Sequence, residues 1–232
     1  MSSPVAAHAA PLLLKQAVIQ MLPDAQLAVT RLPLCPDIQL WLLNGEVLNR
    51  PMNQTEQISI QEHPCYWAFC WASGHMLARY LLDHPELVKG KTVLDVGCGS
   101  GVVSIAAAMA GAHKVIACDL DRDALIATQA NAVLNHVELE VLDDFCAWET
   151  NDHTPSVIIA ADLLYDRSNL ALVSAFLERS KEVMIADSRI RDFTHPAFKT
   201  LGAFASSNQP FSGGYDEFHT VNLYQSLLSE SG

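Results

Sequence analysis

From residue 91 onward, apolar residues follow two alternating patterns. Short apolar runs with strand-like spacing alternate with segments in which apolar residues repeat every three or four positions. The strands predicted from these runs are 92–96, 114–118, 137–141, 156–161, 182–186 and 220–225, and the predicted helices are 102–110, 122–135 and 169–180. Strands that alternate with helices predict an α/β fold with a doubly wound parallel sheet.

Local signals support these boundaries. Gly111 follows the predicted helix 102–110 and is suited to end it, because glycine accepts the left-handed conformation found after helices. Asp121 precedes the next helix and is suited to cap its first turn. The run 156–161 is almost continuously apolar, which is typical of a central strand covered on both faces.

The part of the chain before residue 91 is less regular. An Ala-rich start leads into a short helix, and 38–42 is predicted to form a strand. A further helix is expected to begin at Ser73, a capping residue, and to end near His84, because the residue before a proline disfavours helical angles. We therefore divide the chain into an N-terminal helix and strand extension, 1–63, and an α/β domain, 64–232.

Composition narrows the classes of partner. The chain has 232 residues, of which 50% are apolar, and a formal net charge of −12. It contains no basic run, so a nucleic acid partner is not expected, because binding a phosphate backbone needs clustered Lys and Arg. An acidic protein suits a neutral or cationic substrate.

Six cysteines occur without a C-x-x-C pair, which is typical of a reducing cytoplasm. The apolar patch at 12–14 has no basic residue before it and is too short to cross a bilayer, so neither a signal peptide nor a membrane partner is expected. The histidines and cysteines between 63 and 75 match no common zinc spacing, and no metal site is predicted.

The most informative motif follows the strand 92–96. The residues Val-Leu-Asp-Val-Gly-Cys-Gly-Ser-Gly at 93–101 indicate a strand, a glycine turn and the start of a helix. Such a turn lets the backbone approach a ligand, and the helix directs its positive end toward it. The dinucleotide spacing G-x-G-x-x-G would place its third glycine at Val102, which disfavours NAD. No Gly-Lys-Ser/Thr follows the glycine turn, which excludes a P-loop.

Acidic residues at the strand ends indicate which ligand the turn holds. Asp119 ends the second strand, where a carboxylate accepts hydrogen bonds from ribose hydroxyls. Asp143, Asp144 and Phe145 follow the third strand, where an adenine edge would lie, and Asp95 is placed to meet an ammonium group. A ligand with an adenosine at one end and an amino acid at the other satisfies all of these positions, which predicts S-adenosylmethionine, with S-adenosylhomocysteine as its product.

The glycine motif, followed by Ala-Cys-Asp-Leu-Asp at 117–121, resembles the first two motifs of class I S-adenosylmethionine-dependent methyltransferases. This resemblance implies a Rossmann-like, seven-stranded, mostly parallel sheet. It also implies that the glycine loop holds the methionine end of the cofactor and that Asp119 holds the ribose. The cofactor-binding residues that we expect are Trp71, Asp95, Gly97, Cys98, Gly99, Asp119, Leu120, Asp144, Phe145 and Ala161.

A narrower resemblance covers roughly residues 35–187. The segment Pro-Cys-Tyr-Trp-Ala-Phe-Cys-Trp-Ala-Ser-Gly at 64–74, and the helix and loop after it up to Lys91, are similar to the region ahead of the glycine loop in the electron transfer flavoprotein beta subunit lysine methyltransferases and their bacterial relatives. The residues Ala-Asp-Leu-Leu-Tyr-Asp at 161–166 resemble the Asp-x-x-Tyr signature of seven-strand protein lysine methyltransferases.

The chain departs from that family's pattern at two places. The usual Trp-x-Gly-Gly-Gln is here Trp-Ala-Ser-Gly-His, at 71–75. The usual Asp-Pro-Gly-Arg is here Asp-Ser-Arg-Ile, at 187–190. The first departure concerns the rim of the cofactor site, and the second concerns a substrate loop.

The resemblance implies catalytic roles for two residues. Methyl transfer to a lysine is an in-line displacement by a neutral amine, in which alignment supplies most of the acceleration. Asp162 is expected to anchor the lysine ammonium, and the ring of Tyr165 to face it through a cation–π contact. A channel walled by Trp67, Phe69 or Trp71 would favour the neutral amine by desolvation. Alternatively, Asp162 is a turn residue, Tyr165 belongs to the core, and the aromatic cluster serves packing.

The favoured function is therefore an S-adenosylmethionine-dependent methyltransferase acting on a lysine of a protein substrate, for which the resemblance suggests the electron transfer flavoprotein beta subunit. Two alternatives stay open. One is a small-molecule N-methyltransferase, and the other is a catalytically silent protein that binds S-adenosylmethionine.

Overall fold

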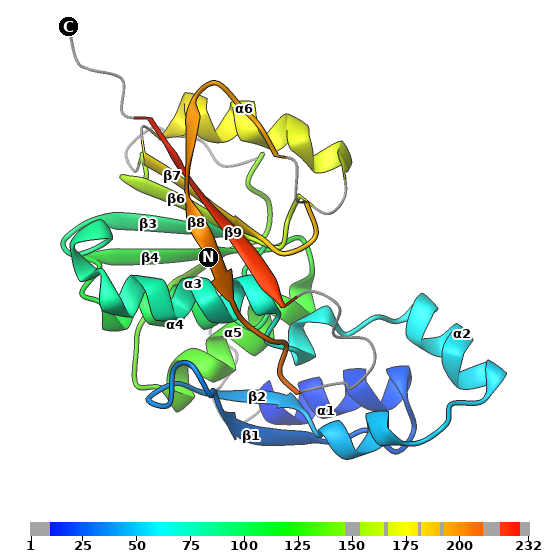
Figure 1. The fold of residues 1–232 in the computed structure, drawn as a ribbon. Coiled ribbons are helices and arrows are strands. Elements are labelled where there is room, and N and C mark those ends of the chain that lie inside the picture. Colours follow the sequence, from blue (N-terminus) through cyan, green and yellow to red (C-terminus); the bar gives the residue numbers. More distant parts are fainter. Residues whose placement is uncertain are drawn as a thin grey trace, which may run out of the picture.

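The computed structural model describes residues 10–146, 154–164, 167–180, 182–190, 193–210 and 219–227. Its centre is a seven-stranded sheet in the order β5-β4-β3-β6-β7-β9-β8 (Figure 1). The first five strands are parallel, and β9 pairs antiparallel with both β7 and β8. The strands are β3 (Thr92–Val96), β4 (Lys114–Cys118), β5 (Glu140–Leu142), β6 (Val157–Ala161), β7 (Glu182–Asp187), β8 (Phe198–Ala205) and β9 (Thr220–Ser226).

Helices cover both faces of this sheet, which confirms the predicted doubly wound α/β fold. Those of one face are α3 (Ala72–Asp83), α4 (Val102–Met109) and α5 (Arg122–Leu134), and α6 (Leu170–Arg179) covers the other. Val93 and Ile159 pack in the core beneath α3 and α4, whereas Leu94 and Ile158 pack with Phe176 of α6. Successive strand residues thus point to opposite faces, which is why the central strands are apolar throughout.

The N-terminal part packs against α5. It contains α1 (Ala10–Met21), a two-stranded antiparallel sheet of β1 (Leu27–Arg31) and β2 (Gln39–Leu43), and α2 (Gln54–Glu62). Leu14 and Val18 of α1 share an apolar cluster with Ala127 and Ala130 of α5. Figure 1 shows these elements gathered beside the main sheet at the end where α5 lies. Within the described residues, no helix has the length and apolar character needed to span a bilayer.

Several sequence-based boundaries are confirmed. The strands at 92–96 and 114–118 have the predicted ends. Asp121 is the N-cap of α5, and its side chain accepts a hydrogen bond from the amide of Asp123. Gly111 follows the last turn of α4 with a φ of +91°, the left-handed conformation that ends many helices.

Two local predictions are wrong. Ser73 does not cap α3: the N-cap is Trp71, and Ser73 lies inside the first turn, where its side chain bonds to Asp162 instead. The third strand is Glu140–Leu142 rather than 137–141. Val137 and Leu139 pack at the edge of the core in the loop before the strand, so their apolar spacing imitates a strand.

The sequence patterns also miss β1, α2 and β8. The helix α2, with the sequence Gln-Thr-Glu-Gln-Ile-Ser-Ile-Gln-Glu, buries no residue, so it has no apolar face to reveal it. A capping box holds its start, because Asn53 accepts from the amide of Glu56 and Glu56 accepts from the amide of Asn53. Strand β8 lies at the sheet edge, where most of its side chains are exposed or half-buried.

Candidate functional site

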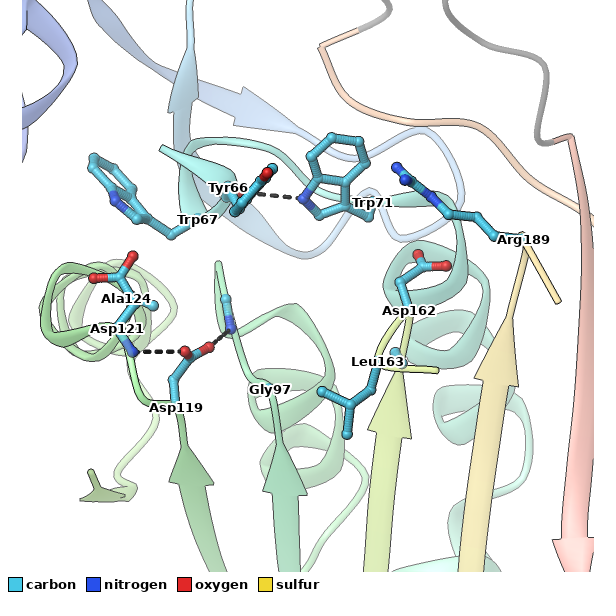
Figure 2. Close-up of a pocket in the computed structure, with 12 residues that line it drawn as sticks. Tyr66, Trp67, Trp71, Gly97, Asp119, Asp121, Ala124, Asp162, Leu163 and Arg189 are labelled. Atoms are coloured by element: carbon cyan, nitrogen blue, oxygen red, sulfur yellow. Dashed lines mark hydrogen bonds between the residues drawn. The ribbon is translucent and has the colours of Figure 1, made fainter. Parts of the chain in front are cut away.

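A cavity of about 220 Å³ opens at the carboxyl ends of β3, β4 and β6 (Figure 2). Here the chain order of the parallel strands reverses, because β4 and β6 lie on opposite sides of β3. Ligands of doubly wound sheets bind at such a switch point. The cavity is lined by Tyr66, Trp67, Trp71, Gly97, Gly99, Asp119, Asp121, Ala124, Ala161, Asp162, Leu163 and Arg189.

Asp119 is held at the floor of the cavity by two backbone amides. Its Oδ2 accepts from the amide of Gly99 over 2.9 Å, and its Oδ1 accepts from the amide of Asp121 over 3.0 Å (Figure 2). Burial raises the pKa of this carboxyl above its usual value. Each carboxylate oxygen has two acceptor sites, so the group can also accept from ligand hydroxyls. This arrangement fits a ribose with two neighbouring hydroxyl groups.

The glycine loop presents bare backbone to the same cavity. Gly99 has a φ of +51°, and no atom lies within 4 Å of the position that a Cβ would occupy there. A ligand can therefore approach this peptide more closely than any side chain would allow. Together with Asp119, the loop fits the predicted cofactor, S-adenosylmethionine.

Asp95 lines a second, smaller cavity of about 40 Å³ that shares Gly97, Gly99 and Trp71 with the first. Only 1% of Asp95 is exposed, and its Oδ2 accepts from the hydroxyl of Ser104 over 2.6 Å. Burial raises the pKa of this carboxyl to about 7, although the Ser104 bond acts in the opposite direction. A cation beside Asp95 would favour its charged form, so the group suits the ammonium end of the cofactor.

Aromatic rings form the opposite wall. The indole Nε1 of Trp71 donates to the carbonyl of Tyr66 over 2.9 Å, and the ring of Phe69 lies 5.3 Å from the Trp71 ring. The guanidinium carbon of Arg189 lies 5.5 Å from the Trp71 ring centre, which is a cation–π geometry. Figure 2 shows the Trp71 indole between Tyr66 and Arg189. This wall is fixed by contacts on both sides.

Asp162 lies at the end of β6, between the cavity and two serine residues. It has a φ of +50°, which is uncommon for a residue other than glycine. Its Oδ1 accepts from the hydroxyl of Ser73 over 2.6 Å and from the hydroxyl and amide of Ser188 over 2.8 and 3.3 Å. Its Oδ2 accepts only from the amide of Ser73, over 3.0 Å, among the described residues. The carboxylate therefore joins the end of β6 to the start of α3 and the end of β7.

The structure brings together most of the residues that the sequence singles out. Those that line the larger cavity are Trp71, Gly97, Gly99, Asp119, Ala161 and Asp162. Asp95 and Cys98 line the smaller one. The proximity of these residues does not by itself test their roles, which stay predictions.

Three of the expected cofactor residues do not line either cavity. Leu120 is 83% exposed, beside Asp119. Asp144 accepts from the amide of Cys146 over 2.7 Å. Phe145 is 4% exposed and packs edge-on against Phe176. Tyr165, the second predicted catalytic residue, lies outside the described residues.

Five residues that line the larger cavity have no site role predicted from the sequence: Tyr66, Asp121, Ala124, Leu163 and Arg189. For two of these residues, the sequence does contain a signal that places them near the site. Asp121 is recognisable as the cap of the helix after β4, and Arg189 follows the end of β7. Residues just beyond the carboxyl ends of parallel strands share one edge of the sheet, so both are candidates on topology alone.

Comparison with solved structures agrees on the fold. A ribosomal protein L11 methylase from Lactobacillus delbrueckii subsp. bulgaricus aligns with a TM-score of 0.51 at 20% identity, covering 68% of this chain and 79% of that one. A magnesium protoporphyrin IX methyltransferase from Synechocystis aligns with a TM-score of 0.51 at 17% identity, covering 78% and 86%. At these identities the likeness shows the methyltransferase fold.

Sequence comparison identifies the family. The profile of the ribosomal protein L11 methyltransferase (PrmA) family matches residues 77–181. The electron transfer flavoprotein beta subunit lysine methyltransferase of Xenopus laevis is 35% identical over 181 residues, which cover 75% of this chain and 72% of the relative. The human protein of the same name is 43% identical over 105 residues, but these cover only 38% of its length and 45% of this chain. The chain therefore belongs to the class I S-adenosylmethionine-dependent methyltransferases, in the family of the electron transfer flavoprotein beta subunit lysine methyltransferases.

Proposed function

We propose that this enzyme transfers a methyl group from S-adenosylmethionine to the side-chain nitrogen of a lysine on a protein. The relatives from Xenopus and human are named for the electron transfer flavoprotein beta subunit, so we propose the corresponding subunit as the first candidate substrate. The observation that carries the proposal is that Asp162 and Trp71 line the same cavity as Gly99 and Asp119. A substrate group and the cofactor would thus meet in one cavity.

Most of the residues that we expect to bind the cofactor lie at the carboxyl ends of the parallel strands. Asp119 would hold the ribose hydroxyls with its remaining acceptor capacity, and the backbone at Gly97–Gly99 would hold the methionine end. Ionised Asp95 would face the ammonium group. Leu120, Asp144 and Phe145 stay our candidates for the adenine end. When bound, the cofactor supplies a methyl group on a positively charged sulfur.

The substrate half depends on Asp162. Among the described residues, its Oδ1 accepts three hydrogen bonds, whereas its Oδ2 accepts one and keeps a site open. We assign the substrate ammonium to Oδ2. The serine donors fix the carboxylate in advance, so little ordering is needed when the lysine enters. Tyr165 stays our candidate for a cation–π contact with the same group.

Transfer requires that the lysine lose its proton before its nitrogen attacks the methyl carbon. The rings of Tyr66, Phe69 and Trp71 form a mutually packed wall on this side of the cavity. A lysine lying against this wall would lose hydration, which lowers the pKa of an amine and favours the neutral nucleophile. The chain would then contribute alignment and desolvation, and the lysine proton would leave to solvent.

The remaining partner and compartment predictions belong to the same proposal. The cysteines of the described chain are free, and five of the six are buried, which suits a reducing compartment such as the cytoplasm. The net charge of −12 and the absence of a basic run disfavour nucleic acid and favour a basic or neutral protein surface.

The decisive experiment combines the enzyme with tritiated S-adenosylmethionine and two substrate sources: purified electron transfer flavoprotein beta subunit and a cell lysate. We expect a labelled protein band, with the label mapped to lysine by mass spectrometry. Label confined to the small-molecule fraction would contradict the proposal in favour of a small-molecule N-methyltransferase. If no label is transferred although the protein still binds S-adenosylhomocysteine, the result would indicate a catalytically silent protein that binds S-adenosylmethionine.

A further inference from the structure

The helix α5 lies between the N-terminal part of the chain and the glycine loop, and polar side chains on it reach both. Asn131 accepts from the amide of Trp41 in β2 over 2.7 Å. The same side chain donates from Nδ2 to the carbonyl of Ser100, in the glycine loop, over 2.8 Å. Asn131 is fully buried, so neither bond competes with water. One amide group therefore connects the N-terminal sheet to the cofactor loop.

The contact with β2 is a geometric match between a helix and a strand edge. Asn135, one helical turn after Asn131, accepts from the amide of Gln39 over 2.9 Å and donates to its carbonyl over 2.6 Å. Residues four apart on a helix are spaced by about 6 Å. Residues two apart on a strand are spaced by about 6.6 Å, so two side chains of α5 meet Gln39 and Trp41 in register. Figure 1 shows β2 running beside α5.

The contact with the glycine loop fixes the orientation of its peptides. Thr128, one turn before Asn131, donates its hydroxyl hydrogen to the carbonyl of Gly99 over 3.1 Å. Because a peptide unit is planar and trans, holding the carbonyls of Gly99 and Ser100 also sets the directions of the next two amides. Both donors on α5 are fully buried. The loop that cradles the cofactor is thus held from behind by the helix on which the N-terminal part rests.

We propose that Asn131 is a positioning residue that couples the N-terminal part of the chain to cofactor binding. The N-terminal extension then contributes to cofactor binding indirectly, because its strand β2 holds Asn131 in the rotamer that orients the glycine loop. Asn135 makes no contact with the loop among the described residues, so it supplies a matched control. The inference concerns the cofactor site and does not depend on the identity of the methyl acceptor.

The first test measures S-adenosylhomocysteine binding by calorimetry and melting temperature in the full-length chain. Asn131→Asp keeps an acceptor for the Trp41 amide but places oxygen against the Ser100 carbonyl. We expect the dissociation constant to rise about tenfold or more. Asn135→Ala removes the bonds to Gln39 but leaves the bond between the Trp41 amide and Asn131, so we expect it to lower the melting temperature while changing the dissociation constant less than about twofold. Equal effects of both variants on binding, or no effect of Asn131→Asp, would overturn the proposal.

The second test uses the unmodified protein and so does not depend on the stability of any variant. Amide hydrogen exchange is followed in β2 with and without saturating S-adenosylhomocysteine. Coupling through Asn131 predicts slower exchange of the Trp41 amide when the ligand is bound. Unchanged exchange throughout β2 at saturation would show that the N-terminal part does not sense the cofactor site.

Discussion

Ser73 and Asp162 are 89 positions apart in the sequence, yet the hydroxyl of Ser73 donates to the Asp162 carboxylate over 2.6 Å. The hydroxyl of Ser188 donates to the same oxygen over 2.8 Å. These two serines stand at the two positions where the resemblance described above implies glycine and proline. Both hydroxyls therefore donate to one carboxylate oxygen and together hold Asp162 in place.

We expect Asp162→Asn to reduce kcat about a hundredfold or more, because the amide cannot hold a lysine ammonium by charge. The side chain keeps its shape, so the dissociation constant of S-adenosylhomocysteine should stay within about threefold of the wild-type value. Turnover with purified protein substrate and calorimetry check the two quantities. Wild-type turnover in this variant would show that Asp162 is not a catalytic residue.

Ser188→Ala distinguishes the positioning of Asp162 from its charge, because the substitution removes one hydrogen-bond donor to Asp162 and leaves the carboxylate intact. We expect the free energy of unfolding to fall by about 1.5 kcal/mol, typical of a hydrogen bond to a charged group. We expect kcat to fall by less than in Asp162→Asn. Chemical denaturation and steady-state kinetics measure these effects, and a kcat loss as large as that of Asp162→Asn would assign the reactive contact to Ser188 itself.

Gly99→Ala should abolish cofactor binding without unfolding the protein. The added methyl group meets no protein atom within 4 Å, so it occupies space that the cofactor needs. Gly90 is the matched control, because it also has a positive φ, of +72°, and an open Cβ position, but it does not line the cavity. Both substitutions should cost about 1 kcal/mol of stability from backbone strain. Calorimetry should show that cofactor binding is lost only in the position 99 variant. Equal cofactor binding in the two variants would contradict the proposed approach of the cofactor to Gly99.

Binding of S-adenosylhomocysteine should strengthen as pH rises through about 7. Burial raises the pKa of Asp95 to about 7 in the free protein, so below that pH the carboxyl is largely protonated. A ligand ammonium requires the charged form, hence binding must release a proton, and affinity should fall toward tenfold per pH unit below 7. Calorimetry in buffers of different ionisation enthalpy measures the released proton. In Asp95→Asn this pH dependence should disappear; if it persists, another group is responsible.

His75 should make the fold less stable in mild acid. It is fully buried, its Nε2 accepts from the amide of Leu34 over 3.1 Å, and its Nδ1 lies 3.1 Å from the carbonyl of Ser207. Burial lowers its pKa below 6.5, although the Ser207 contact acts in the opposite direction. Below pH 6.5 the unfolded chain therefore binds a proton at this position that the folded chain does not bind. The contribution of His75 to the free energy of unfolding is present above pH 6.5 and is lost as pH falls below that value.

The His75→Gln variant isolates that contribution, because glutamine keeps a donor and an acceptor but does not titrate. The free energy of unfolding of wild type minus that of the variant should fall as pH is lowered from 7.5 to 5.5. Urea denaturation at several pH values measures it. Taking the difference at each pH cancels the opposite contribution of Asp95, whose raised pKa favours the folded state in mild acid. A constant difference would mean that His75 does not titrate in this range.

The sequence alone determined the α/β sheet, the glycine loop and the position of Asp119, because these depend on local patterns: apolar runs, a turn that needs glycine, and a strand end. It could not reveal α2 or β8, because neither contains a buried residue and so neither has a clear apolar pattern. Only the tertiary structure decided that Ser73 bonds to Asp162 rather than capping α3, and that Asn131 joins β2 to the glycine loop. These bonds join residues 31 to 90 positions apart. A buried polar group bonds to whichever partner the packed helices and strands bring within reach.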